Sequence, residues 1–183
     1  RVLLDEIQRL DELARTFSQY GRVPEGPRSR VDLGELVRLL GTQHGSGRIP
    51  VRVTTPSEAV MVDGHYDALE RAFRNLVLNA VEAQEVSGGQ VDVSVARDAG
   101  RALVRVEDRG TGIPPELREE IWNPDVTTKS RGTGRGLALV RQTVAHHDGE
   151  VSVANRPDGG ARFEVRLPLA TATGGDTPPG GSA

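Results

Sequence analysis

The chain has 183 residues, which is the length of one ordinary domain with room for a small additional segment. Its net charge of −3 at pH 7 argues against a protein that binds nucleic acid by neutralising phosphates. No apolar run approaches the roughly 18 residues of a membrane span, and the charged first residues do not suggest a signal peptide. Because cysteine is absent, disulfides and thiolate zinc sites are excluded. The 22 glycines gather in a few segments, and these segments carry the main functional signal.

The first 20 residues are predicted to form a helix with an apolar heptad pattern, spaced alternately by four and three: Leu3, Ile7, Leu10, Ala14 and Phe17. Such a short helix needs a packing partner. The pattern alone leaves open whether it packs on its own domain or joins an intermolecular bundle. Residues 21–30 contain two glycines and two prolines and are predicted to be a linker.

The rest of the chain predicts an α+β domain. Asp32, with Glu35 three residues later, indicates the start of a helix at 33–41. Further elements are predicted in this order: strands at 51–55 and 59–63, a long helix at 65–85, a hairpin at 91–96 and 102–107, a helical turn at 115–122, a helix at 136–146 and a hairpin at 150–154 and 161–167. We expect five or six strands in a mostly antiparallel sheet, three main helices on one of its faces, and a disordered tail at 170–183.

The long helix at 65–85 has two contrasting faces. Its apolar face is predicted to be core and consists of Leu69, Phe73, Leu76, Val77 and Ala80. Asn75, Asn79 and Glu82 share the opposite face. Such a face is usually solvated, but asparagine is a poor helix former and a plain surface would more often carry Lys, Glu or Gln. A carboxamide oxygen can coordinate Mg²⁺ without adding charge, so a metal site is the second interpretation.

A predicted strand ends at Asp108, and Gly110 and Gly112 follow. A carboxylate at this place can accept a hydrogen bond from an exocyclic amine, and glycines let a flat ring approach the backbone. The alternative is an ordinary turn that Asp108 supports.

Three alternate glycines, Gly132, Gly134 and Gly136, directly precede the helix at 136–146. Free backbone N–H groups and a helix N-terminus favour an anion such as phosphate, although a loop without a ligand is the alternative. The spacings of a P-loop and of a dinucleotide fingerprint are both absent. Thr128 and Lys129 lie shortly before, where a closing lid could bring them to a terminal phosphate.

These motifs, in this order, resemble the histidine kinase family of two-component signalling, and within it the nitrogen-regulation-like sensors. The similar segments are residues 74–83 to the family's N box, 108–114 to its G1 box, 122–129 to its F box and 132–140 to its G2 box. The resemblance covers about residues 1–169. It implies a two-layer α/β sandwich of the histidine kinase, gyrase and Hsp90 type, with residues 31–169 as the ATP-binding domain.

The resemblance also implies roles for single residues. Asn79 would hold Mg²⁺, Asn75 would line the phosphate side, and Asp108 would bind the adenine amino group beside Gly110 and Gly112. Asn75, Asn79 and Lys129 would be the catalytic residues. The expected lid and phosphate contacts are Thr128, Lys129, Gly132, Thr133, Gly134, Arg135, Gly136 and Leu137.

Residues 1–20 would be the second helix of a dimerisation hairpin, which implies a homodimer in the parent protein and a response regulator as partner. The kinase part would lie in the cytoplasm, whether or not the parent is membrane-anchored. None of the four histidines, His44, His65, His146 and His147, stands where the family's phosphoacceptor is expected. We expect them to be structural or exposed, so the acceptor histidine would lie outside this chain, which would be a C-terminal fragment.

The sequence departs from the family pattern at four positions. Trp122 stands where phenylalanine is common and Asp125 where an aromatic residue is usual, which puts docking of the lid on the helical bundle in question. Arg135 replaces a leucine, and Glu82 stands where many relatives carry a base. The alternatives are a nucleotide-binding signalling module without kinase activity, a gyrase- or chaperone-type ATPase, and an anti-sigma-type Ser/Thr kinase. A hydrolytic ATPase would carry glutamate as general base where this chain has Asn75.

Overall fold

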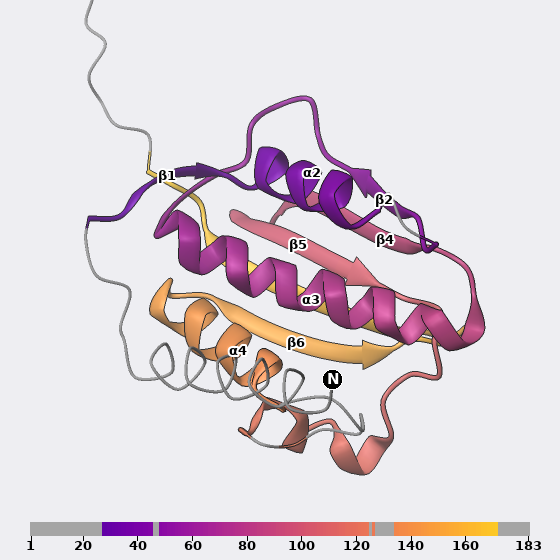
Figure 1. Cartoon of the computed structure of the whole chain (residues 1–183). Coiled ribbons are helices and arrows are strands. Elements are labelled where there is room, and N and C mark those ends of the chain that lie inside the picture. The colour runs from indigo at the N-terminus through magenta and orange to yellow at the C-terminus, as the bar shows by residue number, and fades with distance from the viewer. Residues whose placement is uncertain (1–26, 46–47, 125, 127–133, 172–183) are drawn as a thin grey trace, which may run out of the picture.

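The computed structural model describes residues 27–45, 48–124, 126 and 134–171. The helix predicted at 1–20, the linker up to residue 26 and the tail from residue 172 lie outside this part. Three helices, α2 (Leu33–His44), α3 (Tyr66–Ser87) and α4 (Gly136–His146), lie together over one face of a sheet, as Figure 1 shows. The predicted two-layer arrangement is therefore confirmed.

The main sheet has five strands in the order β2-β4-β5-β7-β6. Their bounds are β2 Val51–Thr54, β4 Val91–Asp98, β5 Arg101–Glu107, β6 Glu150–Asn155 and β7 Ala161–Pro168. Only the β2–β4 pair is parallel, so the sheet is mixed and mostly antiparallel, as predicted. The β4–β5 turn has positive φ at Ala99 (47°) and Gly100 (77°), as a two-residue hairpin turn requires.

A second, two-stranded sheet pairs β1 (Ser29–Asp32) with β3 (Met61–Gly64). The prediction that residues 29 and 30 belong to the linker was wrong, and the described part has seven strands rather than five or six. The physical reason is Val31, which is 3% exposed and pairs with the buried Val62, so this segment contributes to the core. The two strands predicted at 51–55 and 59–63 form, but in different sheets. Ala170 N–H donates to Met61 O (2.8 Å), so the ordered domain extends past the start of the predicted tail.

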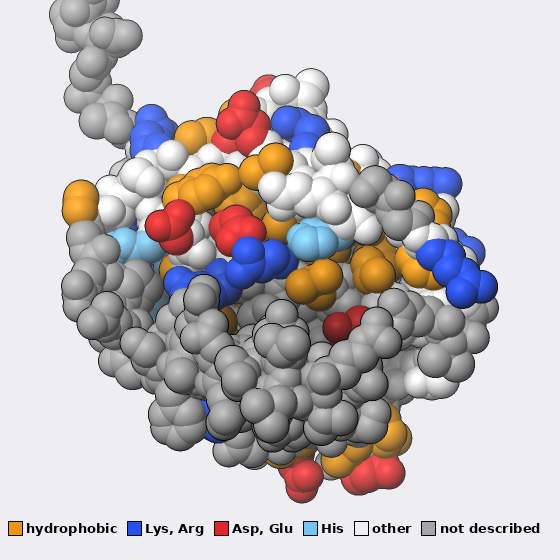
Figure 2. Space-filling view, in the orientation of Figure 1, with side chains coloured by type: hydrophobic (Ala, Val, Ile, Leu, Met, Phe, Trp, Pro, Cys, Tyr) orange, Lys and Arg blue, Asp and Glu red, His pale blue; other side chains and the backbone are white. Residues whose placement is uncertain are grey.

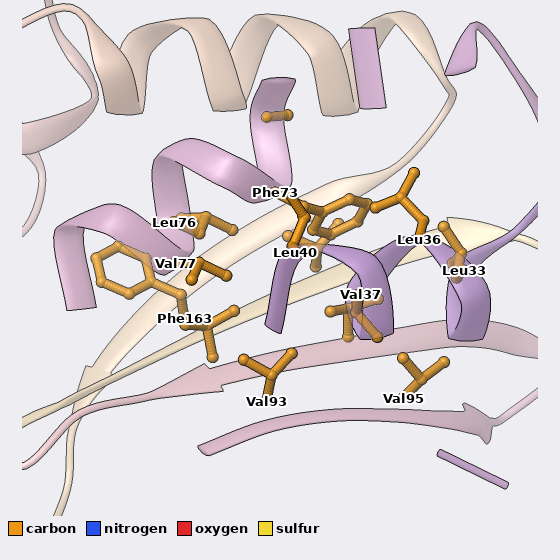
Figure 3. Close-up of a cluster of buried hydrophobic side chains, with 14 of the residues drawn as sticks. Leu33, Leu36, Val37, Leu40, Phe73, Leu76, Val77, Val93, Val95 and Phe163 are labelled. Carbon is orange, nitrogen blue, oxygen red and sulfur yellow. The ribbon is translucent and has the colours of Figure 1, made fainter. Parts of the chain in front are cut away.

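The core lies between the helices and the sheet. Every apolar residue predicted on α3, from Leu69 to Ala80, is at most 1% exposed. In Figure 3, side chains of α2 and α3 converge, with Val37 of α2 above Val93 and Val95 of β4. The start of α2 is fixed as predicted, because Asp32 Oδ1 accepts from Gly34 N–H (2.8 Å).

The other face of the sheet carries paired charges. Arg105 and Glu164 are 2.7 Å apart, and so are Arg162 and Glu107. Burial alone would raise the pKa of Glu164, but hydrogen bonds from Arg105 and Arg166 outweigh it and lower that pKa. Figure 2 shows charged and histidine side chains interleaved with hydrophobic ones on the opposite, helix-covered side. No helix in the described part of the chain is long and apolar enough to cross a membrane.

Candidate nucleotide-binding site

Helix α3 contacts both glycine-rich segments, the one with Gly110 and Gly112 and the one that leads into α4 at Gly136. Near its middle, Asn75 Nδ2 lies 3.5 Å from Gly136 O at the start of α4. Near its end it meets the other segment, because a Cβ atom placed on Gly110 would lie 3.0 Å from Ala83 Cβ. Asn75 and Ala83 are eight residues apart, about 12 Å along a helix, and Asn79 lies between them. Asn75 and Asn79 are half-buried whereas Glu82 is exposed, so the two asparagines do not form a plain solvated face.

Asp108 follows β5 directly and is 4% exposed. Its Oδ1 accepts hydrogen bonds from Gly110 N–H (2.8 Å) and from Ala161 N–H (3.1 Å). A buried carboxylate needs such bonds to offset the loss of hydration. Both bonds use the same oxygen, and together they fix the orientation of the carboxyl group.

The turn between β6 and β7 contacts the backbone of Asp108 and Arg109. Arg156 Nη1 donates to Asp108 O (3.1 Å). Gly160 has a φ of 87°, and a Cβ atom there would overlap the Asp108 carbonyl oxygen and lie 2.7 Å from Arg109 Cα. The hairpin predicted at 150–154 and 161–167 assigns the residues between its strands only a connecting role. The signal for a closer role was the pair of consecutive glycines, Gly159 and Gly160.

Two carboxamides that the sequence motifs did not reveal contact the segment after Asp108. Asn155, at the end of β6, accepts from Ile113 N–H (2.9 Å) and donates to Ile113 O (2.8 Å). Gln84 of α3 is fully buried, and the amide orientation assigned from its neighbours lets it accept from Arg109 N–H and donate to Gly88 O. Neither residue belongs to one of the motifs, and nothing in their distance along the sequence from the segment after Asp108 predicts these contacts.

At the start of α4, the second glycine-rich segment is described from residue 134 onward. Gly134 has a φ of 67°, which favours glycine, and the half-buried Arg135 stands at the N-cap position without a capping hydrogen bond from its side chain. Leu137 packs against the hydrophobic core, so its side chain is structural as well as close to the predicted site. Four predicted contacts, Thr128, Lys129, Gly132 and Thr133, lie outside the described residues, as does Asp125.

The segment before the predicted lid packs on its own domain. The helical turn predicted at 115–122 consists of two short 3-10 helices, Pro115–Leu117 and Glu120–Trp122. The Trp122 ring stacks edge-to-face on Phe163 of β7, with centroids 6.0 Å apart. The unusual tryptophan therefore anchors this segment to the sheet.

His147 has a structural role. It is 3% exposed, its Nδ1 contacts Thr143 O (2.7 Å), and its Nε2 accepts from His65 N–H (2.9 Å). Burial lowers the pKa of His147, which keeps the ring neutral and able to accept that bond. It links the end of α4 to the start of α3 and is too enclosed to be an acceptor of phosphate.

Among the residues that the structure describes, no three His, Asp or Glu side chains are grouped so that they could hold a metal ion. A single carboxamide such as Asn79 suits a cation that takes its other ligands from substrate oxygens and water.

Comparisons with known proteins show the family of this chain. Residues 64–171 match the model of the family described as histidine kinase-, DNA gyrase B-, and HSP90-like ATPase. The chain belongs to this family. Sporulation kinase A of Bacillus subtilis (strain 168) is 34% identical over 136 residues, which are 74% of this chain and 22% of that relative.

Solved histidine kinases share the fold. The catalytic domain of histidine kinase ThkA aligns with a TM-score of 0.71 and 29% identity, covering 79% of this chain and 97% of that one. Full-length ShkA in complex with AMPPNP aligns with a TM-score of 0.78 and 26% identity, covering 92% of this chain and 37% of that one. The prediction of a histidine kinase-type catalytic domain is confirmed, while its placement among nitrogen-regulation-like sensors stays a prediction. The chain spans only 22% to 28% of the first three curated relatives.

Proposed function

We propose that this chain is the ATP-binding catalytic domain of a sensor histidine kinase. It would transfer the γ-phosphoryl group of ATP to a histidine outside these 183 residues, for relay to an aspartate of a response regulator. The observation that carries the proposal is the position of α3, which meets one glycine-rich segment near Asn75 and the other near Ala83. The intervening distance of about 12 Å suits a nucleotide lying along the helix.

The base of the nucleotide would lie at Asp108. The two backbone amides on Oδ1 hold the carboxylate in one orientation, and a carboxylate accepts several further hydrogen bonds. The exocyclic amine of adenine is a donor of the required kind. Gly110 and Gly112 would shape the pocket of the base, because the absence of side chains lets their backbone lie close to Ala83 and to the Asn155 carboxamide.

The phosphates would lie between Asn79 and the start of α4. The N-terminus of a helix favours an anion, and Asn75 contacts the first residue of α4 directly. Thr128, Lys129, Gly132, Thr133, Gly134 and Arg135 remain the proposed lid and phosphate contacts. Asn79 would supply one oxygen to Mg²⁺, which commonly keeps several waters and binds substrate phosphates alongside one or two protein ligands. When bound, the metal would neutralise phosphate charge in the transfer.

The acceptor, the partners and the domain division follow from the same proposal. His147 is enclosed by Thr143 and His65, and His146 Nδ1 contacts Gln142 O (2.9 Å), so both rings serve structure. Residues 1–20 are proposed as part of a dimerisation hairpin joined by a linker to the catalytic domain. A homodimeric parent, a receiver-domain partner and a cytoplasmic kinase part belong to this proposal too.

A hydrolytic ATPase is disfavoured by the residue at position 75. A general base must accept a proton near neutral pH, and the Asn75 carboxamide cannot do so. Its amide nitrogen also lies 3.5 Å from Gly136 O. Steady hydrolysis of ATP by this chain alone would contradict the assignment.

The first test is nucleotide binding with Asp108→Asn as the variant. Hydrogen bonds to charged groups contribute about 1.5–3 kcal/mol, so the variant should bind ATP about 10- to 100-fold more weakly in calorimetric titration. Asp98→Asn, at the exposed far end of β4, is the matched control and should not change the affinity. Equal affinities of wild type and Asp108→Asn would reject the base site.

The second test is phosphoryl transfer. With labelled ATP and Mg²⁺, the chain alone should stay unlabelled, whereas a separate hairpin polypeptide that carries the acceptor histidine should be labelled when the two are combined. Label on the chain itself would refute the external acceptor. Nucleotide binding without any transfer would instead favour a signalling module without kinase activity.

A further inference from the structure

The backbone of residues 109–113 is held by side chains from two other elements. At its far end, Asn155 exchanges two hydrogen bonds with Ile113, as a neighbouring strand would (2.9 and 2.8 Å). Gly112 precedes this pair with a φ of 75°, and a Cβ atom there would lie 3.1 Å from the Asn155 carboxamide. The glycine therefore lets the chain turn close enough for both bonds.

At its near end, the same segment is held from α3. Gln84 is fully buried, and in the amide orientation assigned from its neighbours it accepts from Arg109 N–H and donates to Gly88 O. A buried amide is costly unless both of its polar atoms are bonded, so this arrangement fixes the distance between the end of α3 and Arg109. Between the two carboxamides, Asp108 Oδ1 takes Gly110 N–H.

We propose that Asn155 and Gln84 are positioning residues for nucleotide binding, which fix the segment 109–113 before the base arrives. This inference rests on the proposed function. Neither residue needs to touch the nucleotide. A segment that is already ordered loses less conformational freedom on binding, and affinity is gained in proportion. Removal of either carboxamide should therefore weaken the binding of every ligand that carries the base, whatever the number of its phosphates.

The experiment is calorimetric titration of ADP and of ATP, both with Mg²⁺, into the full chain and its variants. Asn155→Ala removes both hydrogen bonds to Ile113. It should weaken the binding of ADP and of ATP by the same factor, about three- to tenfold. Asn155→Asp is isosteric and keeps an acceptor for Ile113 N–H, but it sets an oxygen against Ile113 O. Asn155→Asp should weaken the binding of both nucleotides at least as much as Asn155→Ala does. If Asn155 only filled space, this isosteric variant would bind them normally.

Two further variants separate positioning from general stability. Arg166→Ala removes a 2.7 Å ion pair with Glu164, toward the end of β7 that lies away from Asp108. It should lower the unfolding temperature and leave both affinities unchanged. Gln84→Met keeps the side-chain length without hydrogen bonds and should reproduce the equal loss for ADP and ATP.

The possible outcomes separate this inference from the proposed function. If the wild-type chain binds ADP and ATP but Asn155→Ala and Gln84→Met stay within about twofold of it, the positioning role is overturned while the nucleotide site stands. A loss confined to ATP also overturns it, because that would place the effect at the phosphates. If the wild-type chain binds neither nucleotide, the proposed function itself fails and this inference with it.

Discussion

The contact of Gly160 with the backbone of Asp108 leads to a quantitative prediction. A Cβ atom on Gly160 would overlap Asp108 O and lie 2.7 Å from Arg109 Cα, both of them backbone atoms. Gly159 is the matched control, since its φ of 92° is close to the 87° of Gly160 but its nearest atom, Gly110 O, would be 4.0 Å away. Alanine at either position therefore suffers similar backbone strain, and only Gly160→Ala adds an overlap.

The two contributions can be estimated separately. Placing an L-residue in a left-handed conformation costs about 1–2 kcal/mol, which both variants share. An overlap that the backbone must relieve costs a further 1–3 kcal/mol or so, as overpacking does in a core. Gly160→Ala should thus reduce the free energy of unfolding by about 1–3 kcal/mol more than Gly159→Ala. Because the shift occurs at Asp108, Gly160→Ala should also weaken ATP binding by about tenfold or more.

Urea unfolding of both variants measures the difference in stability, and calorimetric titration with Mg²⁺ and ATP measures the affinities. The calorimetric titration should be performed at a temperature well below the unfolding temperature of each variant, so that only folded protein is compared. If Gly160→Ala and Gly159→Ala have the same stability and the same affinity for ATP, the turn at Gly160 does not hold Asp108 in place.

Two more predictions concern the phosphate side and pH. Asn79→Ala should bring the affinities for ATP measured with and without Mg²⁺ close together, whereas Glu70→Ala, elsewhere on α3, should keep the wild-type ratio; an unchanged ratio in Asn79→Ala would reject the metal role. Burial lowers the pKa of His147 below 6.5, so the unfolded chain binds this proton more readily than the folded one, and the stabilisation present above pH 6.5 is lost as the pH falls below it. His147→Gln should flatten the fall in unfolding free energy between about pH 7 and 5, measured by urea titration at each pH, and a slope equal to that of the wild type would show that His147 is not the responsible group.

Local patterns were sufficient to predict most of the elements. The alternation of apolar residues in β4, β5 and β7 and the apolar face of α3 are properties of neighbouring residues, and burial follows them. The strand at Ser29–Asp32 was missed because glycine and proline dominate the preceding residues. Its formation depends on β3, which lies about 30 residues later and is not visible in a local pattern.

The candidate site was predicted unevenly for the same reason. Asn75, Asn79 and Asp108 stand in motifs, because each would act on the ligand directly. Asn155 contacts the backbone of Ile113, 42 residues earlier, and Gly160 contacts the backbone of Asp108, about 50 residues earlier. Contacts between such distant residues produce no recognisable spacing in the sequence. Residues that position a site are therefore harder to predict from sequence than residues that bind.

The two ends of the candidate site differ in the hydrogen bonds that the described residues make there. Around Asp108, hydrogen bonds of 2.8 to 3.1 Å come from the segment itself, from β7 and from the β6–β7 turn. At the phosphate end, the contact between Asn75 and Gly136 is 3.5 Å, the outer limit of a hydrogen bond. If the base lies at Asp108 as proposed, variants near Asp108 should change the affinities for ADP and ATP equally. Variants near Asn75 and Asn79 should separate the two affinities, because only ATP carries the phosphate that this end would bind and transfer.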